Sequence, residues 1–564
     1  MRKHACTLII FVILSVLSIK CVSAQTINTS EDYFIEGVRY YNEDNLEKAS
    51  TLFKQSIKKD QGNDAAYYYL SNIKSKEESY RDALLYISKA LEIDPDNITY
   101  LRSQARLYEY TGEKEKAAQI YLSIIDKNPS STRTYWELAN IYLSENKYDK
   151  VTEIIDRVEA MKGVGEYTKR TRYEIYKMSG KGKEAMDLLQ DLVKEYPSAQ
   201  YSNELAYYYR ERSDDSLAAY YYNDALRLDP GFSFANLGLA ELYRAKGEFG
   251  DFFKNAYIFM ADPNVNQMVK CEYLQDYIFP SNLVVLFTPQ VDTVIINTIT
   301  AHPTDSSVLT LASQYYAATG REGHAEGIIK RNIELHPENI RLKYNLLSFY
   351  MTFQKWDRLI DASEQVLKYY PDDYNVKEVI AVAYGQMGEY RKAIAQYEKL
   401  LSSLPKGHEA ILNCYASLGD LYYETGTPSK AFRYYEKALK ISPDNTHVLN
   451  NYAYFLGLKE KNLSKALKMS RKTIDLEPDN ATFLDTYGWL LFLNGEYEAS
   501  RRILKQAINY GGKSNAVMLD HYAEALYAVG EHDLAMLYWK DADKIDPSLG
   551  IAVKMKKRME EKKQ

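Results

Sequence analysis

Histidines, cysteines and carboxylic acids are the side chains in this 564-residue sequence that could bind a metal or transfer protons. The eight histidines include no pair four residues apart, and outside the N-terminal leader none lies within five residues of a cysteine. Cys271 and Cys414, the two cysteines outside the N-terminal leader, are too far apart to form a metal-binding or redox motif. Neither a glycine-rich phosphate loop nor a nucleophile elbow occurs. The sequence therefore predicts no catalytic residue, no metal ligand, no cofactor and no enzymatic activity.

The first 24 residues have the features of a secretory signal peptide. A basic start is followed by an apolar run over residues 5–19 and by a small-residue end at Ala24. A retained membrane anchor is the alternative, but a run of 15 residues is short for crossing a bilayer. We expect cleavage after Ala24, no transmembrane segment in the mature chain, and a periplasmic or secreted protein.

The charge balance argues against nucleic acid as a partner. The sequence has 71 Lys and Arg, and removal of the leader, which holds three of them and no acid, leaves 68 against 77 Asp and Glu. The mature chain is therefore net negative by nine charges. Phosphate backbones are bound mainly through a concentrated positive field, which this composition does not predict.

Prolines recur at a nearly constant spacing along the chain. The gaps between successive prolines of this series are 34, 68, 33, 33, 40, 34, 34, 34, 38, 35 and 69 residues, and the two long gaps are close to twice the short ones. A period of about 34 residues is expected for stacked helix-turn-helix units. The series is Pro95, Pro129, Pro197, Pro230, Pro263, Pro303, Pro337, Pro371, Pro405, Pro443, Pro478 and Pro547.

The clearest units also repeat a small residue followed four positions later by an aromatic one. Small residues allow two helices to approach closely, and the aromatic side chain fills the gap against the next unit. An Asp or Asn after the proline, as at Asn97 and Asn480, can cap the next helix. The clearest pairs are Ala49 and Phe53, Ala117 and Tyr121, Ala218 and Tyr222, Ala393 and Tyr397, Ala431 and Tyr435, and Ala535 and Trp539.

This pattern resembles the tetratricopeptide repeat family over residues 30–549. The resemblance implies an all-α fold: an α-solenoid, a right-handed superhelix of about 15 helix-turn-helix repeats. We expect an N-terminal array over 25–263, a distorted repeat with an elongated loop over 264–305, a C-terminal array over 306–549 and a polar closing helix over 550–564. The distorted repeat is interpreted either as a docking loop or as a degenerate unit. The run from Asp485 to Trp489 is similar to exported bacterial members, which favours a Gram-negative source.

The resemblance further implies that the first helix of each unit lines a concave groove. Residues one turn apart on these helices predict a basic and aromatic front half and an acidic rear half. The predicted binding residues in front are Tyr68, Asn72, Arg102, Arg106, Trp136, Asn140 and Arg170, which suit an extended or acidic peptide. The alternative is that they are solvated, with Trp136 packed on the next repeat. The acidic rear positions are Glu378, Asp420, Asp485, Asp520 and Glu524.

We therefore expect a non-catalytic scaffold of the bacterial cell envelope that binds segments of protein partners in this groove. One alternative is an accessory of envelope assembly or polysaccharide handling that binds a glycan. The other is an enzyme with its site in the distorted segment. The sequence leaves the identity of the partner and the oligomeric state open.

Overall fold

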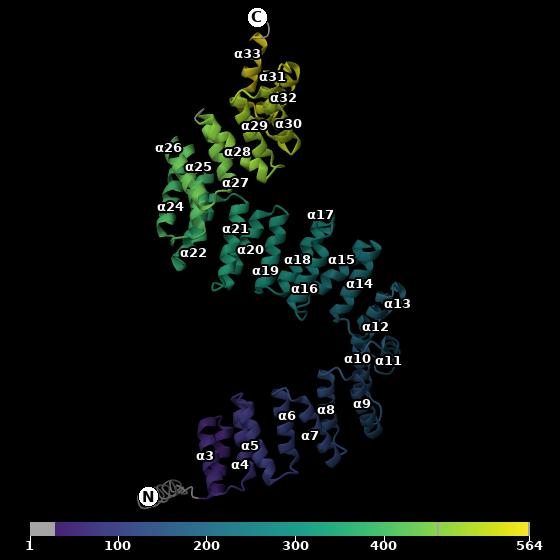
Figure 1. Ribbon diagram of the computed structural model, residues 1–564. Coiled ribbons are helices and arrows are strands. Elements are labelled where there is room, and N and C mark those ends of the chain that lie inside the picture. Colours follow the sequence, from purple (N-terminus) through teal and green to yellow (C-terminus); the bar gives the residue numbers. More distant parts are fainter. Residues whose placement is uncertain (1–28, 460–461, 562–564) are drawn as a thin grey trace, which may run out of the picture. The chain divides into compact units, whose positions relative to one another are not determined.

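The computed structural model describes residues 29–459 and 462–561. Every regular element within these residues is a helix, and no strand occurs among them (Figure 1). The chain divides into two compact units, Met1–Asp262 and Pro263–Gln564. The predicted secretory leader, residues 1–24, lies outside the described residues.

The first unit consists of seven consecutive helix pairs. The pairs are α2 (Ser30–Asn42) and α3 (Leu46–Lys59), α4 (Asp64–Lys76) and α5 (Tyr80–Ile93), α6 (Ile98–Tyr110) and α7 (Lys114–Lys127), α8 (Thr132–Ser144) and α9 (Tyr148–Lys162), α10 (Glu166–Met178) and α11 (Gly182–Glu195), α12 (Ala199–Glu211) and α13 (Asp215–Leu228), and α14 (Ser233–Lys246) and α15 (Phe249–Ala261).

The second unit begins with an irregular segment and continues with seven regular pairs. The irregular segment contains α16 (Gln267–Tyr273), the π-helical turn η1 (Leu274–Ile278), α17 (Leu283–Leu286) and α18 (Thr288–Ala301). The pairs are α19 (Ser306–Ala318) and α20 (Glu322–Leu335), α21 (Ile340–Thr352) and α22 (Trp356–Tyr369), α23 (Tyr374–Gln386) and α24 (Tyr390–Ser403), α25 (Ala410–Glu424) and α26 (Pro428–Ile441), α27 (Thr446–Leu458) and α28 (Leu463–Leu476), α29 (Ala481–Leu493) and α30 (Tyr497–Asn509), and α31 (Ala516–Ala528) and α32 (His532–Ile545). Two short 3-10 turns, η2 (Gly512–Ser514) and η3 (Pro547–Leu549), and the last helix, α33 (Ile551–Glu561), complete the unit.

These elements confirm the predicted α-solenoid with about 15 repeats. The turn between the two helices of a pair uses one residue with left-handed backbone angles, such as Gly112 with φ 81° and Gln354 with φ 51°. The turn between pairs follows the proline, and the predicted caps form there. Asn97 Oδ1 accepts hydrogen bonds from the backbone N–H groups of Thr99 and Tyr100 at 3.0 and 3.3 Å, and Asn480 caps α29 in the same way.

The small and aromatic positions of the repeat form the core, as the sequence predicts. The six alanines of the pairs named above are fully buried, and their six aromatic partners are at most 3 % exposed. Some positions are small because an aromatic ring occupies the space beside them. A Cβ atom placed on Gly419 would lie 2.3 Å from Cε1 of Tyr435, and one on Gly238 would lie 2.2 Å from Cζ of Tyr222.

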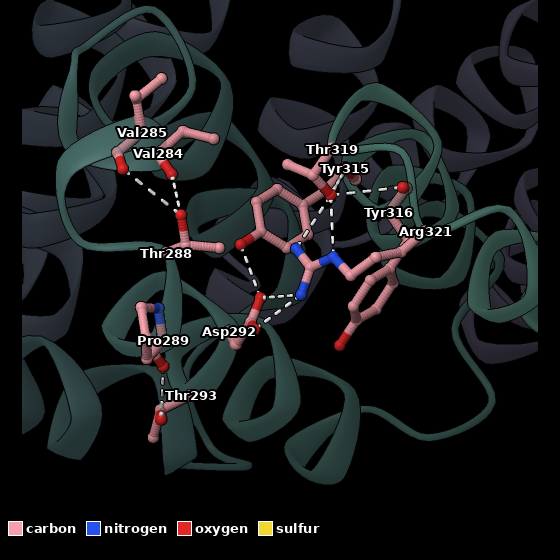
Figure 2. A network of polar contacts seen from close by, with 10 residues as sticks. All are labelled: Val284, Val285, Thr288, Pro289, Asp292, Thr293, Tyr315, Tyr316, Thr319 and Arg321. Atoms are coloured by element: carbon pink, nitrogen blue, oxygen red, sulfur yellow. Dashed lines mark hydrogen bonds and ion pairs between the residues drawn. The ribbon is translucent and has the colours of Figure 1, made fainter.

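The irregular segment is tied to α19 by one carboxylate. Asp292 of α18 accepts hydrogen bonds from Arg321 Nη1 at 2.6 Å to each oxygen and from the Tyr315 hydroxyl at 2.7 Å (Figure 2). The Thr288 hydroxyl donates to the carbonyl of Val284 at 2.7 Å, at the junction of α17 and α18. The elongated loop is therefore anchored on a packed repeat, while Val285 at its tip is 80 % exposed.

Candidate partner-binding groove

The seven binding residues predicted from the sequence lie on four successive first helices of the first unit. Tyr68 and Asn72 are on α4, Arg102 and Arg106 on α6, Trp136 and Asn140 on α8, and Arg170 on α10. Arg106, Asn140 and Arg170 are exposed, and the other four are half-buried.

The arginines of α6 meet a carboxylate of α8 that the sequence prediction did not include. Arg102 Nε donates to Oε2 of Glu137 at 2.9 Å, and Arg102 Nη2 donates to the Thr134 hydroxyl at 3.1 Å. Arg106 lies 3.6 Å from the other oxygen of Glu137, and Arg133 Nε donates to that oxygen at 3.2 Å. Three guanidinium groups thus surround one carboxylate, which leaves this cluster net positive by two charges.

The two aromatic residues among the seven predicted binding residues contact adjacent repeats. Trp136 packs edge-on against Tyr167 of α10, with ring centroids 4.9 Å apart. Tyr68 lies 5.1 Å from the ring of Tyr100, whose hydroxyl donates to Asp64 at 3.0 Å. Burial, and then Asp64, raise the pKa of Tyr100, so its phenol stays protonated. Trp136 therefore has the packing contact that the alternative interpretation expected, and its ring is half-buried.

In the second unit, most of the predicted acidic residues are engaged within the chain. Asp485 and His521 are both buried, with Nδ1 of His521 3.0 Å from a carboxylate oxygen, and the His521 ring stacks on Trp489 with centroids 4.1 Å apart. Asp420 accepts hydrogen bonds from the Tyr435 hydroxyl and from Asn451 Nδ2. Most of the acidic residues predicted for the rear half therefore make contacts that join adjacent repeats.

The closing helix α33 ends the array through a lysine that the sequence prediction did not single out. Lys554 Nζ lies 2.6 Å from Asp520 and 3.0 Å from Glu524 on α31. Burial acts to lower the pKa of Lys554, but the two carboxylates outweigh it and raise this pKa. Ile551 of the same helix is fully buried. The predicted polar helix thus carries one apolar face and one cation into the end of the stack.

Across residues 29–459 and 462–561, no group of three or more His, Cys, Asp or Glu side chains is placed to hold a metal ion. The same part of the chain contains no helix that is both long and apolar enough to span a bilayer.

Consecutive helix pairs with a period of about 34 residues define an α-solenoid built from helical-hairpin repeats. Residues 103–131, 179–231 and 372–444 each match a family model described as tetratricopeptide repeat. The chain therefore contains tetratricopeptide repeats, a motif typical of scaffolds for protein–protein interaction.

Individual relatives are similar over a short stretch or at low identity. A tetratricopeptide repeat-containing protein of Methanocaldococcus jannaschii is 30% identical over 110 residues, which is 20% of this chain and 19% of that protein. Among solved structures, a chain of Naa15/Naa10 bound to HypK-THB is 14% identical to this protein. The match covers 94% of this chain and 96% of that chain, with a TM-score of 0.32. The Cut9–Hcn1 hetero-tetramer of APC/C is also 14% identical, with coverages of 96% and 98% and a TM-score of 0.37.

Proposed function

We propose that this protein is an exported, non-catalytic scaffold of the bacterial cell envelope whose first unit binds an extended acidic segment of a partner protein. The observation that carries the proposal is the excess of arginine around Glu137, beside the half-buried ring of Trp136. Placement in the envelope rests on the leader sequence and on the resemblance of residues 485–489 to exported bacterial proteins.

Arg106 and Arg133 have N–H donors that their contacts with Glu137 do not use. A guanidinium group carries five N–H donors, whereas Arg106 makes one loose ion pair at 3.6 Å and is 52% exposed. Arg133 is 64% exposed and donates through Nε alone. A carboxylate of a partner could therefore receive a bidentate pair from either side chain without displacing Glu137.

The binding test uses the mature chain, residues 25–564, and a fluorescein-labelled peptide of six glutamates. We expect the fluorescence anisotropy to rise to saturation as protein is added. The affinity should fall between 50 and 300 mM NaCl, because exposed charges are screened at high salt. Charge reversal of Arg106→Glu together with Arg170→Glu should weaken binding about tenfold. The matched control is Arg157→Glu, an exposed arginine on the second helix α9, which should leave the affinity within about twofold of the unmodified protein.

The envelope test places a photo-crosslinking amino acid at Asn140 in cells that produce the protein. We expect capture of a protein from the envelope fraction, loss of that capture in the Arg106→Glu, Arg170→Glu variant, and none from a probe at Asp187 on α11. Capture of a glycan would replace this proposal with the polysaccharide-handling alternative. Equal capture from both probe positions, or a hexaglutamate affinity unchanged by charge reversal, would contradict it.

A further inference from the structure

A cavity of about 500 Å³ opens in the first unit between α10, α11, α12 and α14. Its walls are mainly apolar and aromatic, with Tyr173, Met186, Leu189, Tyr207, Tyr222 and Phe234 among the lining residues. Tyr173, Leu189 and Tyr222 are at most 6 % exposed, so the inner wall is part of the fixed core. Gly182 and Ala185 form part of the α11 wall, and a Cβ atom on Gly182 would meet no atom within 4 Å. The cavity therefore combines a buried aromatic wall with small residues on the α11 side.

Two adjacent acceptor atoms in this wall lack donors. Oδ1 of Asn203 and Oε2 of Glu204, both on α12, are buried and have no hydrogen-bond partner within residues 29–459 and 462–561. The other oxygen of Glu204 accepts from Gln200 Nε2 at 3.1 Å. Burial, and then the charge of Glu204 and a side-chain hydrogen bond to it, raise the pKa of Tyr173, so this phenol is a neutral donor beside the acid. Buried polar atoms in native proteins are nearly always hydrogen-bonded, so the Asn203 oxygen indicates a missing donor. The neutral phenol of Tyr173 leaves the charge of Glu204 without a cationic partner in this wall.

The basic residues around the cavity do not supply this donor. Arg210 lies 4.9 Å from the ring centroid of Tyr207, Arg212 lies 3.5 Å from that of Tyr208, and Lys177 lies 5.8 Å from that of Tyr173. Within the described part of the chain, no ion pair joins Glu204 to any of these cations or to Arg170, one repeat earlier. A carboxylate attracts a positively charged N–H donor most strongly, since charge-assisted hydrogen bonds are about twice as strong as neutral ones.

We propose that this cavity binds a flat aromatic group that carries a protonated amine, with the ring among the tyrosines and the amine donating to Glu204 and Asn203. A cavity of this volume is in the range of small-molecule sites and has room for an indole with a two-carbon amine. Two sources share this chemistry: a free arylalkylamine, and the N-terminal aromatic residue of a polypeptide, in which the α-ammonium group stands beside the ring. The cavity is separate from the Glu137 cluster and does not depend on the proposed binding of acidic segments.

The test is calorimetric titration of the mature chain with tryptamine and with tryptophol, which replaces the ammonium group by a hydroxyl on the same indole body. We expect saturable binding of tryptamine and at least tenfold weaker binding of tryptophol. Glu204→Gln should weaken tryptamine at least tenfold, because it removes the charge and keeps the shape of the side chain. The matched control is Glu211→Gln, an exposed carboxylate at the rim on the same helix, which should change the affinity by less than twofold. Circular dichroism checks that both variants remain helical.

The two sources are distinguished by the tripeptide amide Trp-Gly-Gly and its N-acetylated form. Binding of the free tripeptide, lost on acetylation, assigns the site to chain termini as well as free amines, whereas binding of tryptamine alone assigns it to free amines. Either result supports the site. The proposal is overturned by the absence of saturable heat, by tryptophol binding as tightly as tryptamine, or by equal losses in Glu204→Gln and Glu211→Gln. The tryptophol comparison needs no variant, so it decides the matter even where Glu204→Gln does not fold. Hexaglutamate binding by the Glu204→Gln variant should remain intact.

Discussion

Gly419→Ala should destabilise the second unit, although alanine is the better helix former. The added Cβ would lie 2.3 Å from Cε1, 2.5 Å from Cδ1 and 2.9 Å from Cζ of Tyr435. Carbon atoms in favourable contact are about 3.5–4.0 Å apart, so the ring must move by more than ~1 Å. Tyr435 is fully buried and stacks on Tyr452 at 5.5 Å, which leaves little room for that movement.

The net effect follows from three contributions. Overpacking a filled core costs about 1–3 kcal/mol. Pulling the Tyr435 hydroxyl away from the Asp420 carboxylate adds about 1.5–3 kcal/mol, since that hydrogen bond has a charged acceptor. Replacing glycine by alanine inside a helix stabilises the folded state by about 1 kcal/mol. We expect a net loss of about 1.5–5 kcal/mol in the free energy of unfolding.

The assay is urea denaturation followed by circular dichroism, combined with hydrogen exchange and mass spectrometry to locate the change. Because each repeat contacts mainly its neighbours, faster exchange should be confined to α25, α26 and α27. Gly385→Ala on α23 is the matched control: its nearest neighbour would be Leu421 Cδ2 at 3.8 Å, an ordinary contact, so stability should rise slightly. The packing argument fails if Gly419→Ala unfolds at the same or a higher urea concentration than the unmodified protein, or if both substitutions have the same effect.

Three further predictions concern a strained turn, the thiols and an unpaired acid. Gln354→Gly should raise the free energy of unfolding by about 0.5–1 kcal/mol, because it relieves a left-handed φ of 51° at an exposed turn, and a fall in the urea midpoint would contradict this. Burial raises the pKa of Cys271 to about 11 and of Cys414 to about 12, so neither thiol of the mature chain should react with Ellman's reagent at pH 8 until urea is added. Burial also raises the pKa of Glu378, so ionising this acid lowers stability as pH rises above its usual range. Glu378→Gln should therefore stabilise the protein at pH 8. The difference in thermal unfolding midpoint between the variant and the unmodified protein should shrink as the pH is lowered towards 4.

The repeat itself could be predicted from the sequence because its signals are local and recur many times. Proline spacing, the small and aromatic positions and the Asn caps each depend on a few neighbouring residues, and errors in one unit are corrected by the others. The cavity beside Tyr222 could not be predicted in this way. The sequence identifies Tyr222 as a packing residue, which its 2 % exposure confirms, but the cavity is lined by residues of several helices whose spacing no single stretch of sequence encodes.

The partners of the groove residues were missed for a different reason, and their separations along the chain explain it. Reading residues one turn apart on a single helix finds side chains that face the groove, but these side chains bond to the next first helix, about one period away. Arg102 and Glu137 are 35 residues apart, Asp485 and His521 are 36 apart, and Asp520 and Lys554 are 34 apart. A search for complementary residues 34 to 36 positions apart would have found all three pairs.

The same rule indicates which groove residues are available to a partner. An acid or base whose counterpart one period away has opposite charge becomes part of the wall, as Asp520 does with Lys554. Arg106 has the neutral Asn140 one period later, and its contact with Glu137 is shared with two other arginines. The position equivalent to Glu378 in the next unit is the small Ala416, because these two units are 38 residues apart, and burial alone raises the pKa of Glu378. Contacts between adjacent repeats therefore neutralise most of the acidic positions predicted for the second unit, and the proposed recognition of a partner rests on the few positions where the repeat places no complementary side chain.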